Sequence, residues 1–497
     1  MQTANAFTVI GFLKMSSVRQ RKLIEETGAA WDAHSSSPKQ PSSRQRKANW
    51  PKRFFIFVAC VAVVTLILGS YTNVLPWNIP GHATNVLDNI AYSLGIQKHV
   101  YAVIIDAGST GSRVLAFAFH ESVIDKNLKL DDELFVQVKP GLSSFADNPV
   151  KGAESLQELL DRAKAFVPRE EWGHTPLAMK ATAGLRLLPG DKANALLDEV
   201  RKLFDASPFL TNENSVAIMD GVDEGLFSWF TVNFLMDRLG GSGGDGTVAA
   251  LDLGGGSTQI TFAPTDHTTL KEARSELLHK VSAFRQSLSV YTNSYLGLGL
   301  MAARKGVLLQ GNKSDVKEIH SDCVNPIING KEWTFSGSTY LVSGPPPDRA
   351  VYQEIKGGAN KVGEKKPIVD WKRCSQLVRA YVAGKVEKPQ PVELNRKDRT
   401  INAFSYYFDR ATEFGLIDPF SGGVVTVKQF EDAAKKSCET PNAEQPFMCL
   451  DLTFITVLLQ DGFGLKPEKS LNLYKKIDGH EISWALGAAF HILQNGL

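Results

Sequence analysis

The chain has 497 residues, which is long for one domain and sufficient for two. Hydrophobic residues make up 43% of it and charged residues 22%, which are ordinary globular values that exclude a wholly disordered or fibrous protein. Residues 1–53 hold ten of the 55 Lys and Arg residues but only three of the 53 Asp and Glu residues, so the basic excess lies in one tail and does not indicate a nucleic-acid partner.

An apolar run follows this tail. Residues 54–75 contain no charged side chain, and the run is long enough to cross a hydrocarbon core of about 30 Å as a helix. Tryptophan and basic residues precede it, and Tyr71 and Trp77 follow, as in an aromatic belt with positive charge inside. We expect a disordered cytosolic tail at 1–53, a transmembrane signal anchor at 54–75 and a stem at 76–97. A cleaved signal peptide and a buried core helix are the alternatives.

Two later stretches share one pattern. Val100–Phe119 and Thr247–Pro264 each contain an apolar run that ends in Asp, a turn of Gly, Ser and Thr, and a second run of alternating apolar residues. This pattern predicts a strand, a tight turn and a strand. Because Asp106 and Asp252 occupy equivalent places, we expect an internal repeat, with two related α/β lobes and a cleft between them.

The remaining periodic segments complete these lobes. An amphipathic helix is expected at Glu154–Phe166. A second helix is expected at His480–Leu493, where small residues would let another backbone come close. We assign residues 98–220 together with 479–497 to lobe I, and residues 221–478 to lobe II.

Four cysteines follow the apolar run and would lie in an oxidising lumen. An even number suggests two disulfides, for which three pairings exist, although four buried thiols are the alternative. We expect a short Cys438–Cys449 clip and a Cys323–Cys374 bridge. Asn312 begins an N-glycosylation sequon.

The turns that follow the two aspartates have the composition of a phosphate site. Glycine lets the backbone approach a ligand closely, and successive N–H groups in such a turn form a concave anion site to which hydroxyls add donors. Neither turn matches a P-loop or a dinucleotide fingerprint. One such turn alone could be a plain hairpin, but two copies favour phosphate binding by Ser109, Thr110, Gly111, Gly255, Gly256, Ser257 and Thr258.

The two aspartates themselves suggest a metal. Asp106 and Asp252 would stand beside the phosphate, where a bare carboxylate is repelled. A hydrated divalent cation removes this conflict, because Mg²⁺ keeps its waters and is often held by one or two carboxylates plus phosphate oxygens. The alternative is that each aspartate merely caps its own turn.

Glu224 is a candidate general base. It stands next to a glycine at the start of a segment that predicts an amphipathic helix, so its carboxylate could point into the cleft and deprotonate water. Such a base contributes about 10²–10⁴ in rate. The simpler alternative is a favourable interaction between an acidic residue and the helix dipole.

The motifs DAGSTGSR, ATAGLRLLP, GVDEGLFSW, LDLGGGSTQITF and SWALGAAF, in that order, resemble the apyrase conserved regions of the ectonucleoside triphosphate diphosphohydrolases. The resemblance runs from about Val100 to Leu493. It implies two RNase H-like lobes of the actin, Hsp70 and sugar-kinase superfamily, a divalent cation (Mg²⁺ or Ca²⁺) held through water by Asp106 and Asp252, and Glu224 as catalytic base. It also implies that Thr182 and Ala183 contact the attacking water and the terminal phosphate, with Gln259 nearby. Trp484 and one of Tyr406 or Tyr407 would border the nucleoside.

Several features resemble the endoplasmic reticulum, Golgi or secreted branch of that family. These are the four lumenal cysteines, the DEG of the third motif and the lack of a second apolar span at the C-terminus. The branch implies hydrolysis of UDP, GDP and IDP in preference to ATP, which would support glycosylation. It also implies a single-pass type II membrane protein of the Golgi or endoplasmic reticulum, which is either retained in the membrane or cleaved and secreted. A broad apyrase, a kinase or polyphosphatase of the same fold, and a non-catalytic Hsp70-like module are the alternatives, and the oligomeric state is not predicted.

Overall fold

The computed structural model describes residues 97–122, 126–239, 244–284, 286–310, 316–354, 365–386 and 392–497, and the single positions 61 and 91. The expected cytosolic tail, the apolar run at 54–75 and Asn312 lie outside the described residues, so these expectations stay predictions. The chain divides into two compact units, residues 1–79 and 80–497, and every element named below belongs to the second. Within the described part of the chain, no helix combines the length and the apolar character needed to span a membrane.

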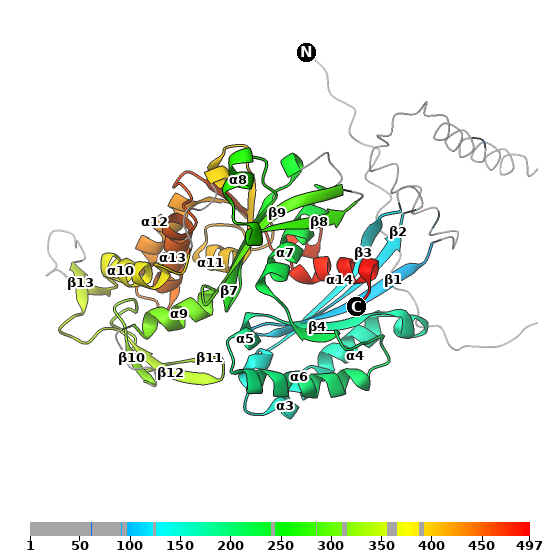
Figure 1. Ribbon diagram of the computed structural model, residues 1–497. Coiled ribbons are helices and arrows are strands. Elements are labelled where there is room, and N and C mark those ends of the chain that lie inside the picture. Colours follow the sequence, from blue (N-terminus) through cyan, green and yellow to red (C-terminus); the bar gives the residue numbers. More distant parts are fainter. Residues whose placement is uncertain are drawn as a thin grey trace, which may run out of the picture. The chain divides into compact units, whose positions relative to one another are not determined.

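The first sheet contains five strands in the order β3-β2-β1-β4-β5 (Figure 1). Its central hairpin pairs β1 with β2 antiparallel, β3 continues it antiparallel, and β4 and β5 run parallel to β1. The strands are β1 (His99–Ala107), β2 (Ser112–Glu121), β3 (Leu128–Val138), β4 (Leu177–Ala181) and β5 (Val216–Ile218).

The second sheet contains seven strands in the order β16-β17-β15-β6-β7-β9-β8. Its five central strands, β9-β7-β6-β15-β17, repeat the order and the directions of β3-β2-β1-β4-β5. This confirms the predicted internal repeat and the two-lobed α/β class. The strands are β6 (Ala249–Leu253), β7 (Ser257–Phe262), β8 (Leu278–Ala283), β9 (Gln286–Leu296), β15 (Ile401–Ser405), β16 (Gly423–Thr426) and β17 (Ser470–Leu473).

Helices and small sheets cover the two large sheets. The helix expected at Glu154–Phe166 is confirmed as α4 (Gln157–Phe166), but it begins three residues later than expected, because Glu154 ends a separate helix, α3 (Pro149–Glu154), which Asn148 caps. Lobe I also has α5 (Ala183–Arg186) and α6 (Gly190–Asp205). The further elements are α8 (His267–Glu272), α9 (Leu300–Leu308), β10 (Glu318–His320), β11 (Lys331–Phe335), β12 (Ser338–Ser343), β13 (Val351–Glu354), β14 (Lys365–Ile368), α10 (Trp371–Val382), α11 (Tyr406–Phe414), α12 (Val427–Cys438), α13 (Met448–Val457), β18 (Lys476–Ile477) and β19 (His480–Glu481).

Two helices lie between the large sheets, α7 (Gly221–Leu235) and α14 (Trp484–Asn495) (Figure 1). A Cβ on Gly487 would be 2.5 Å from the carbonyl oxygen of Phe227, so the small residue predicted for close approach does allow the two backbones to touch. The amphipathic character expected of α7 is wrong. This helix is buried on almost all sides, because α14 covers the face that the second sheet leaves open.

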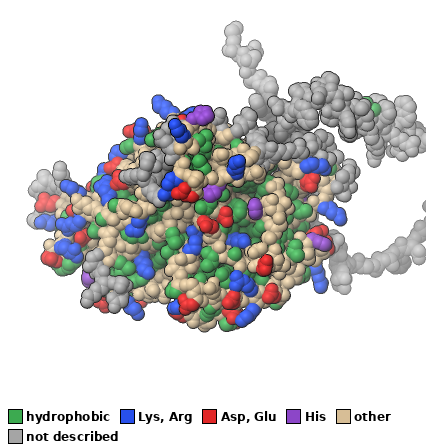
Figure 2. Space-filling view, viewed as in Figure 1, with side chains coloured by type: hydrophobic (Ala, Val, Ile, Leu, Met, Phe, Trp, Pro, Cys, Tyr) green, Lys and Arg blue, Asp and Glu red, His purple; other side chains and the backbone are tan. Residues whose placement is uncertain are grey.

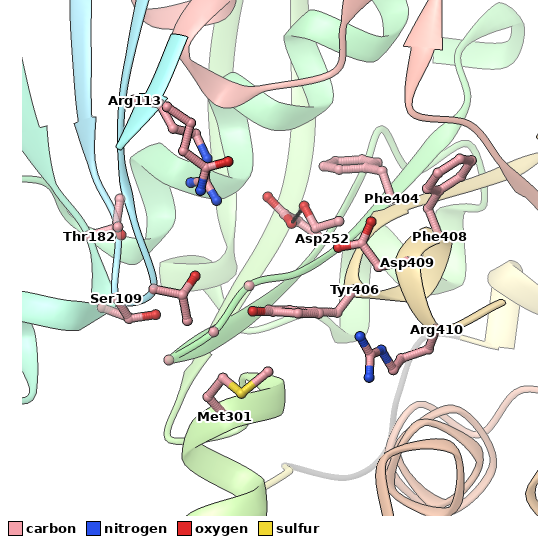
Figure 3. A pocket seen from close by; sticks show the side chains of 18 of the residues that line it. Ser109, Arg113, Thr182, Asp252, Met301, Phe404, Tyr406, Phe408, Asp409 and Arg410 are labelled. Atoms are coloured by element: carbon pink, nitrogen blue, oxygen red, sulfur yellow. Dashed lines mark hydrogen bonds between the residues drawn. The ribbon is translucent and has the colours of Figure 1, made fainter. Parts of the chain in front are cut away.

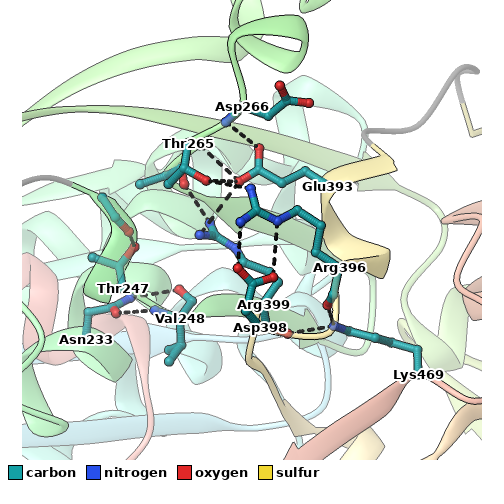
Figure 4. Close-up of polar contacts among 12 residues, drawn as sticks. Asn233, Thr247, Val248, Thr265, Asp266, Glu393, Arg396, Asp398, Arg399 and Lys469 are labelled. Carbon is teal, nitrogen blue, oxygen red and sulfur yellow. Dashed lines mark hydrogen bonds and ion pairs between the residues drawn. The ribbon is translucent and has the colours of Figure 1, made fainter.

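Buried polar contacts fix the start of β15 within lobe II (Figure 4). The carboxylate of Glu393 accepts hydrogen bonds from the N–H and the hydroxyl of Thr265, at 3.0 and 2.9 Å. Lys469 Nζ donates to the carbonyl oxygens of Arg396 and Arg399, at 2.7 and 2.6 Å. The first contacts connect the segment after β7 with the segment before β15, and those of Lys469 connect the segment before β15 with the start of β17. The other end of β15 reaches the site described below.

The four cysteines form the two predicted disulfides. Cys323 is bonded to Cys374 in α10, and Cys438 at the end of α12 is bonded to Cys449 in α13. On the face seen in Figure 2, acidic and basic side chains are interspersed, in keeping with a net charge of +2.

Candidate active site

The two hairpin turns have the same construction. The N–H of Gly108 donates to the carbonyl oxygen of Gly111 at 3.1 Å, and in the second turn the N–H of Gly254 donates to that of Ser257 at 3.0 Å. The turns also meet, because a Cβ built on Gly255 would overlap the hydroxyl oxygen of Ser109. A side chain at 255 would therefore have to displace the Ser109 hydroxyl.

A cavity of about 630 Å³ lies over these turns. Figure 3 shows Ser109 and Thr182 on one side of it, and Asp252 and Tyr406 on the other. Most of the predicted site residues line this cavity. They are Asp106, Ser109, Thr110, Thr182, Ala183, Glu224, Asp252, Gly255, Gly256, Ser257, Tyr406 and Trp484.

Four predicted residues do not line the cavity. Thr258 donates its hydroxyl to the main-chain oxygen of Asp252 at 2.6 Å, and the side chain of Gln137 fills the space in front of Gly111. Gln259 and Tyr407 are buried, so Tyr406 is the tyrosine that faces the cavity. The direct phosphate contacts predicted for Gly111 and Thr258, and the place of Gln259 near the phosphate, stay predictions. The three residues lie behind the turns, and at least Thr258 and Gln259 hydrogen-bond to residues that line the cavity.

The two aspartates end equivalent strands but have different partners. Asp106 Oδ2 accepts a hydrogen bond from Arg113 Nη1 at 2.9 Å, whereas its buried Oδ1 has no partner among the described residues. Asp252 accepts from two hydroxyls, Ser405 Oγ at 2.7 Å and Ser228 Oγ at 3.2 Å. Burial raises the pKa of both carboxyls. Neither carboxylate accepts a hydrogen bond from its own turn in the described structure, which disfavours a purely capping role.

Glu224 lies in the first turn of α7, which Asp220 caps by accepting from the N–H of Val222 at 2.8 Å. The side chain is only 7% exposed, and its Oε2 accepts hydrogen bonds from Arg186 Nη2 and from Gln259 Nε2. Burial raises the pKa of Glu224 to about 8, with the negative charges of the two aspartates adding to this effect and Arg186 opposing it. A fixed carboxyl with a pKa near neutral pH suits a general base.

Thr182 joins β4 to α5. Its hydroxyl does not cap α5, although the residue occupies the N-cap position, and it lines the cavity. The segment that follows packs against the first turn, since a Cβ on Gly184 would be 2.8 Å from the Cα of Ser109. Thr182 therefore lines the cavity with a hydroxyl that α5 does not use as a cap.

Sequence reasoning missed Arg113, Arg186 and Ser405. Arg113 could have been predicted from the hairpin, because it lies directly opposite Asp106 in the β1–β2 register. Arg186 and Glu224 are 38 residues apart, and Ser405 and Asp252 are 153 apart, so no local pattern connects these pairs.

Comparison with known proteins finds similar proteins over most of the chain. The sequence model of the GDA1/CD39 (nucleoside phosphatase) family matches residues 94–496. The human protein named nucleoside diphosphate phosphatase ENTPD5 is 42% identical over 401 residues, which cover 80% of this chain and 88% of that protein. Human ectonucleoside triphosphate diphosphohydrolase 6 is 40% identical over 454 residues, 89% of this chain and 87% of that protein. The solved structure of nucleoside triphosphate hydrolases from Neospora caninum matches 84% of this chain and 98% of its own, with a TM-score of 0.54 and 15% identity, and thus shares the fold.

Proposed function

Because the chain belongs to the GDA1/CD39 (nucleoside phosphatase) family, we propose that it hydrolyses the terminal phosphate of nucleoside diphosphates to give the monophosphate and inorganic phosphate. UDP, GDP and IDP are the proposed substrates, and triphosphates are poorer ones. The observation that carries this proposal is the meeting of two glycine turns, at Ser109 and Gly255, in one cavity with the buried carboxylate of Glu224. The similarity to a protein named nucleoside diphosphate phosphatase supports the choice of diphosphates.

The proposed reaction is a direct displacement by water. Glu224 Oε2 is held by Arg186 and Gln259, while Oε1 has no donor among the described residues and is free to accept from a water. That water, also contacted by the Thr182 hydroxyl, attacks the terminal phosphorus, and Glu224 takes its proton. The bond from phosphorus to the bridging oxygen breaks, and no covalent intermediate forms. N–H groups and hydroxyls of both turns stabilise charge on the phosphoryl oxygens.

We also propose a divalent cation, Mg²⁺ or Ca²⁺, held through water by Asp106 and Asp252. The residues fit such an ion, because Asp106 Oδ1 is buried without a partner among the described residues, and the hydrogen bonds of Asp252 come from two neutral hydroxyls. Among the described residues, no cluster of three or more His, Cys, Asp or Glu side chains could hold a metal ion. When bound, the cation would offset negative charge on the phosphate oxygens.

For the location of the protein we propose the lumen of the Golgi or the endoplasmic reticulum, with the segment 54–75 as an anchor that is retained or cleaved. Two disulfides support an oxidising compartment. There the enzyme would remove the diphosphates left by sugar transfer and so support glycosylation. Protease protection of the tagged full chain in sealed microsomes tests this topology, and digestion of the catalytic region from outside the vesicles contradicts it.

Phosphate release from the full chain tests the activity. UDP, GDP, IDP, ATP and inorganic polyphosphate are compared without an acceptor, each with Mg²⁺, Ca²⁺ or a chelator. Glu224→Gln is expected to bind UDP but to lose about 10²–10⁴ in rate. The matched control is Glu413→Gln, another cavity carboxylate, which pairs with Arg410. Near-full turnover by Glu224→Gln, or release from polyphosphate alone, contradicts the proposal.

A further inference from the structure

On one side of the cavity, the charged side chains described next are paired with one another by hydrogen bonds. Arg304 donates from Nε to Asp451 Oδ1 at 3.0 Å, and its guanidinium lies over the ring of Phe447 at 4.5 Å. Arg410 donates to Asp451 at 3.2 Å and to Glu413 at 2.6 Å. A ligand that reaches this side therefore meets acidic and basic groups that are already paired.

Asp409 is different. It lines the same cavity and is half-buried, yet it accepts no hydrogen bond and forms no ion pair with any residue of the described structure. In Figure 3 its carboxylate is directed into the cavity and away from Arg410. Burial raises the pKa of Asp409, an effect opposed by the positive charges of Arg410, Lys475, Arg113 and Lys139. A partly desolvated carboxylate without a donor is costly unless a ligand supplies one.

The place of Asp409 along α11 indicates which part of the substrate it reaches. Ser405, directly before α11, holds Asp252 at the proposed phosphate and cation site. At about 1.5 Å per helical residue, Asp409 stands about 6 Å further along the helix axis. In a nucleoside diphosphate whose terminal phosphate occupies the turns, the ribose is the first group beyond the inner phosphate. The sugar is thus the part of the substrate that lies at this distance.

We propose that Asp409 accepts hydrogen bonds from the 2′- and 3′-hydroxyls of the ribose, and that the site thereby selects ribonucleotides over deoxyribonucleotides. An ionised carboxylate only accepts, and its two oxygens match the two donors of a vicinal diol. Acidic side chains read ribose hydroxyls in dinucleotide-binding folds for the same reason. A substrate without a hydroxyl leaves the carboxylate unpaired, and sites built on such polar contacts discriminate strongly. This inference rests on the proposed function and adds the group that recognises the sugar.

The test compares UDP with 2′-deoxy-UDP and 3′-deoxy-UDP on the full chain with Mg²⁺. The wild type is expected to prefer UDP in kcat/KM by about tenfold or more. Asp409→Ala is expected to remove most of this preference, because kcat/KM falls more for UDP, which loses two hydrogen bonds, than for each deoxy substrate, which loses one. Glu413→Gln, one turn later on α11 and paired with Arg410, is the matched control and keeps the preference. Inorganic tripolyphosphate, which has no sugar, serves as a probe that Asp409→Ala does not affect.

Two results overturn the inference. One is a wild type that does not discriminate between UDP and its deoxy forms, and the other is an Asp409→Ala variant that loses the same factor on all substrates. If the alanine variant does not fold, the near-isosteric Asp409→Asn is measured instead and is expected to retain less than half of the preference in free-energy terms. Equilibrium binding of UMP and 2′-deoxy-UMP separates this inference from the proposed function. If the protein binds UMP more tightly than 2′-deoxy-UMP but does not hydrolyse UDP, the role of Asp409 is supported and the proposed hydrolase activity is refuted.

Discussion

Ser405 has a backbone conformation that only glycine adopts freely, with φ 58° and ψ −127°. It is also the residue whose hydroxyl donates to Asp252 Oδ1 at 2.7 Å. A non-glycine residue held in such a region costs about 1–3 kcal/mol and persists where its surroundings or its function require it. We therefore predict that Ser405→Gly is more stable than Ser405→Ala, although both variants are impaired in activity.

The difference between the two variants isolates the backbone. Both lack the hydroxyl, so the lost hydrogen bond to Asp252 affects them equally. Glycine relieves about 1–3 kcal/mol of strain, and its greater freedom in the unfolded chain opposes this by about 0.5–1 kcal/mol. The net expectation is that the free energy of unfolding of Ser405→Gly exceeds that of Ser405→Ala by about 1 kcal/mol, within a range of about 0–2.5 kcal/mol. At an unstrained strand position, alanine is the more stable residue, so the sign itself is informative.

Chemical denaturation of both variants measures this difference, and phosphate release as a function of Mg²⁺ concentration measures the state of Asp252. Without the Ser405 hydroxyl, Asp252 loses one of its two fixed donors, so both variants are expected to need a similarly raised Mg²⁺ concentration. An alanine variant as stable as the glycine variant refutes the strain argument. An unchanged Mg²⁺ dependence in both refutes the positioning of Asp252 by Ser405.

Three further predictions concern other parts of the molecule. Burial raises the pKa of Glu224 to about 8, so between about pH 5 and pH 9 the folded state keeps a proton that the unfolded state has lost. In the presence of a chelator, the stability of the wild type relative to Glu224→Gln should therefore fall as the pH rises through this range. A stability difference that does not change with pH contradicts this prediction. Gly255→Ala should lower phosphate release strongly, because the added methyl group overlaps the Ser109 side chain. Gly246→Ala is the control and should not lower it, because no atom lies within 4 Å of a Cβ at this position. Equal activities of the two variants would show that the turns need not meet. The Cys323–Cys374 bridge closes a loop of 51 residues, and the Cys438–Cys449 bridge closes a loop of 11. Replacing the first pair by alanine should lower the free energy of unfolding, measured in urea, by about 4 kcal/mol, and replacing the second pair should lower it by about 3 kcal/mol. The reverse order contradicts the loop-entropy reasoning.

The internal repeat was the feature that the sequence predicted best. A strand that ends in Asp, a glycine turn and a second strand are all encoded within about 20 residues, so local periodicity suffices to find them. The structure adds that Asp106 faces Arg113 and Asp252 faces Gln259 at the same place in each hairpin. The disulfide pairing and the small residue at Gly487 were predicted for similar reasons of spacing and size.

The remaining features depend on contacts that sequence spacing does not contain. Nothing in the order of residues shows that Tyr406 faces the cavity while its neighbour Tyr407 is buried, because this follows from where α11 begins after the unusual backbone of Ser405. The helix that carries Glu224 was expected to be amphipathic but is buried on almost all sides, because a helix almost 250 residues later in the chain packs on it. Such features require the tertiary fold.

The difference between the two hairpins supports the proposed cation. Asp106 is paired with Arg113, and Glu224 with Arg186, but at the place equivalent to Arg113 the second hairpin has the neutral Gln259.

When all of these groups are ionised, the three carboxylates exceed the two guanidinium groups by one charge, and that excess is located at Asp252, whose partners are two neutral hydroxyls. A third guanidinium at this position would neutralise the charge that attracts the metal. A polyphosphate cannot enter a buried site with net negative charge without a counter-charge. Binding of the nucleotide and binding of the cation are therefore expected to be coupled, each raising the affinity for the other by the same factor.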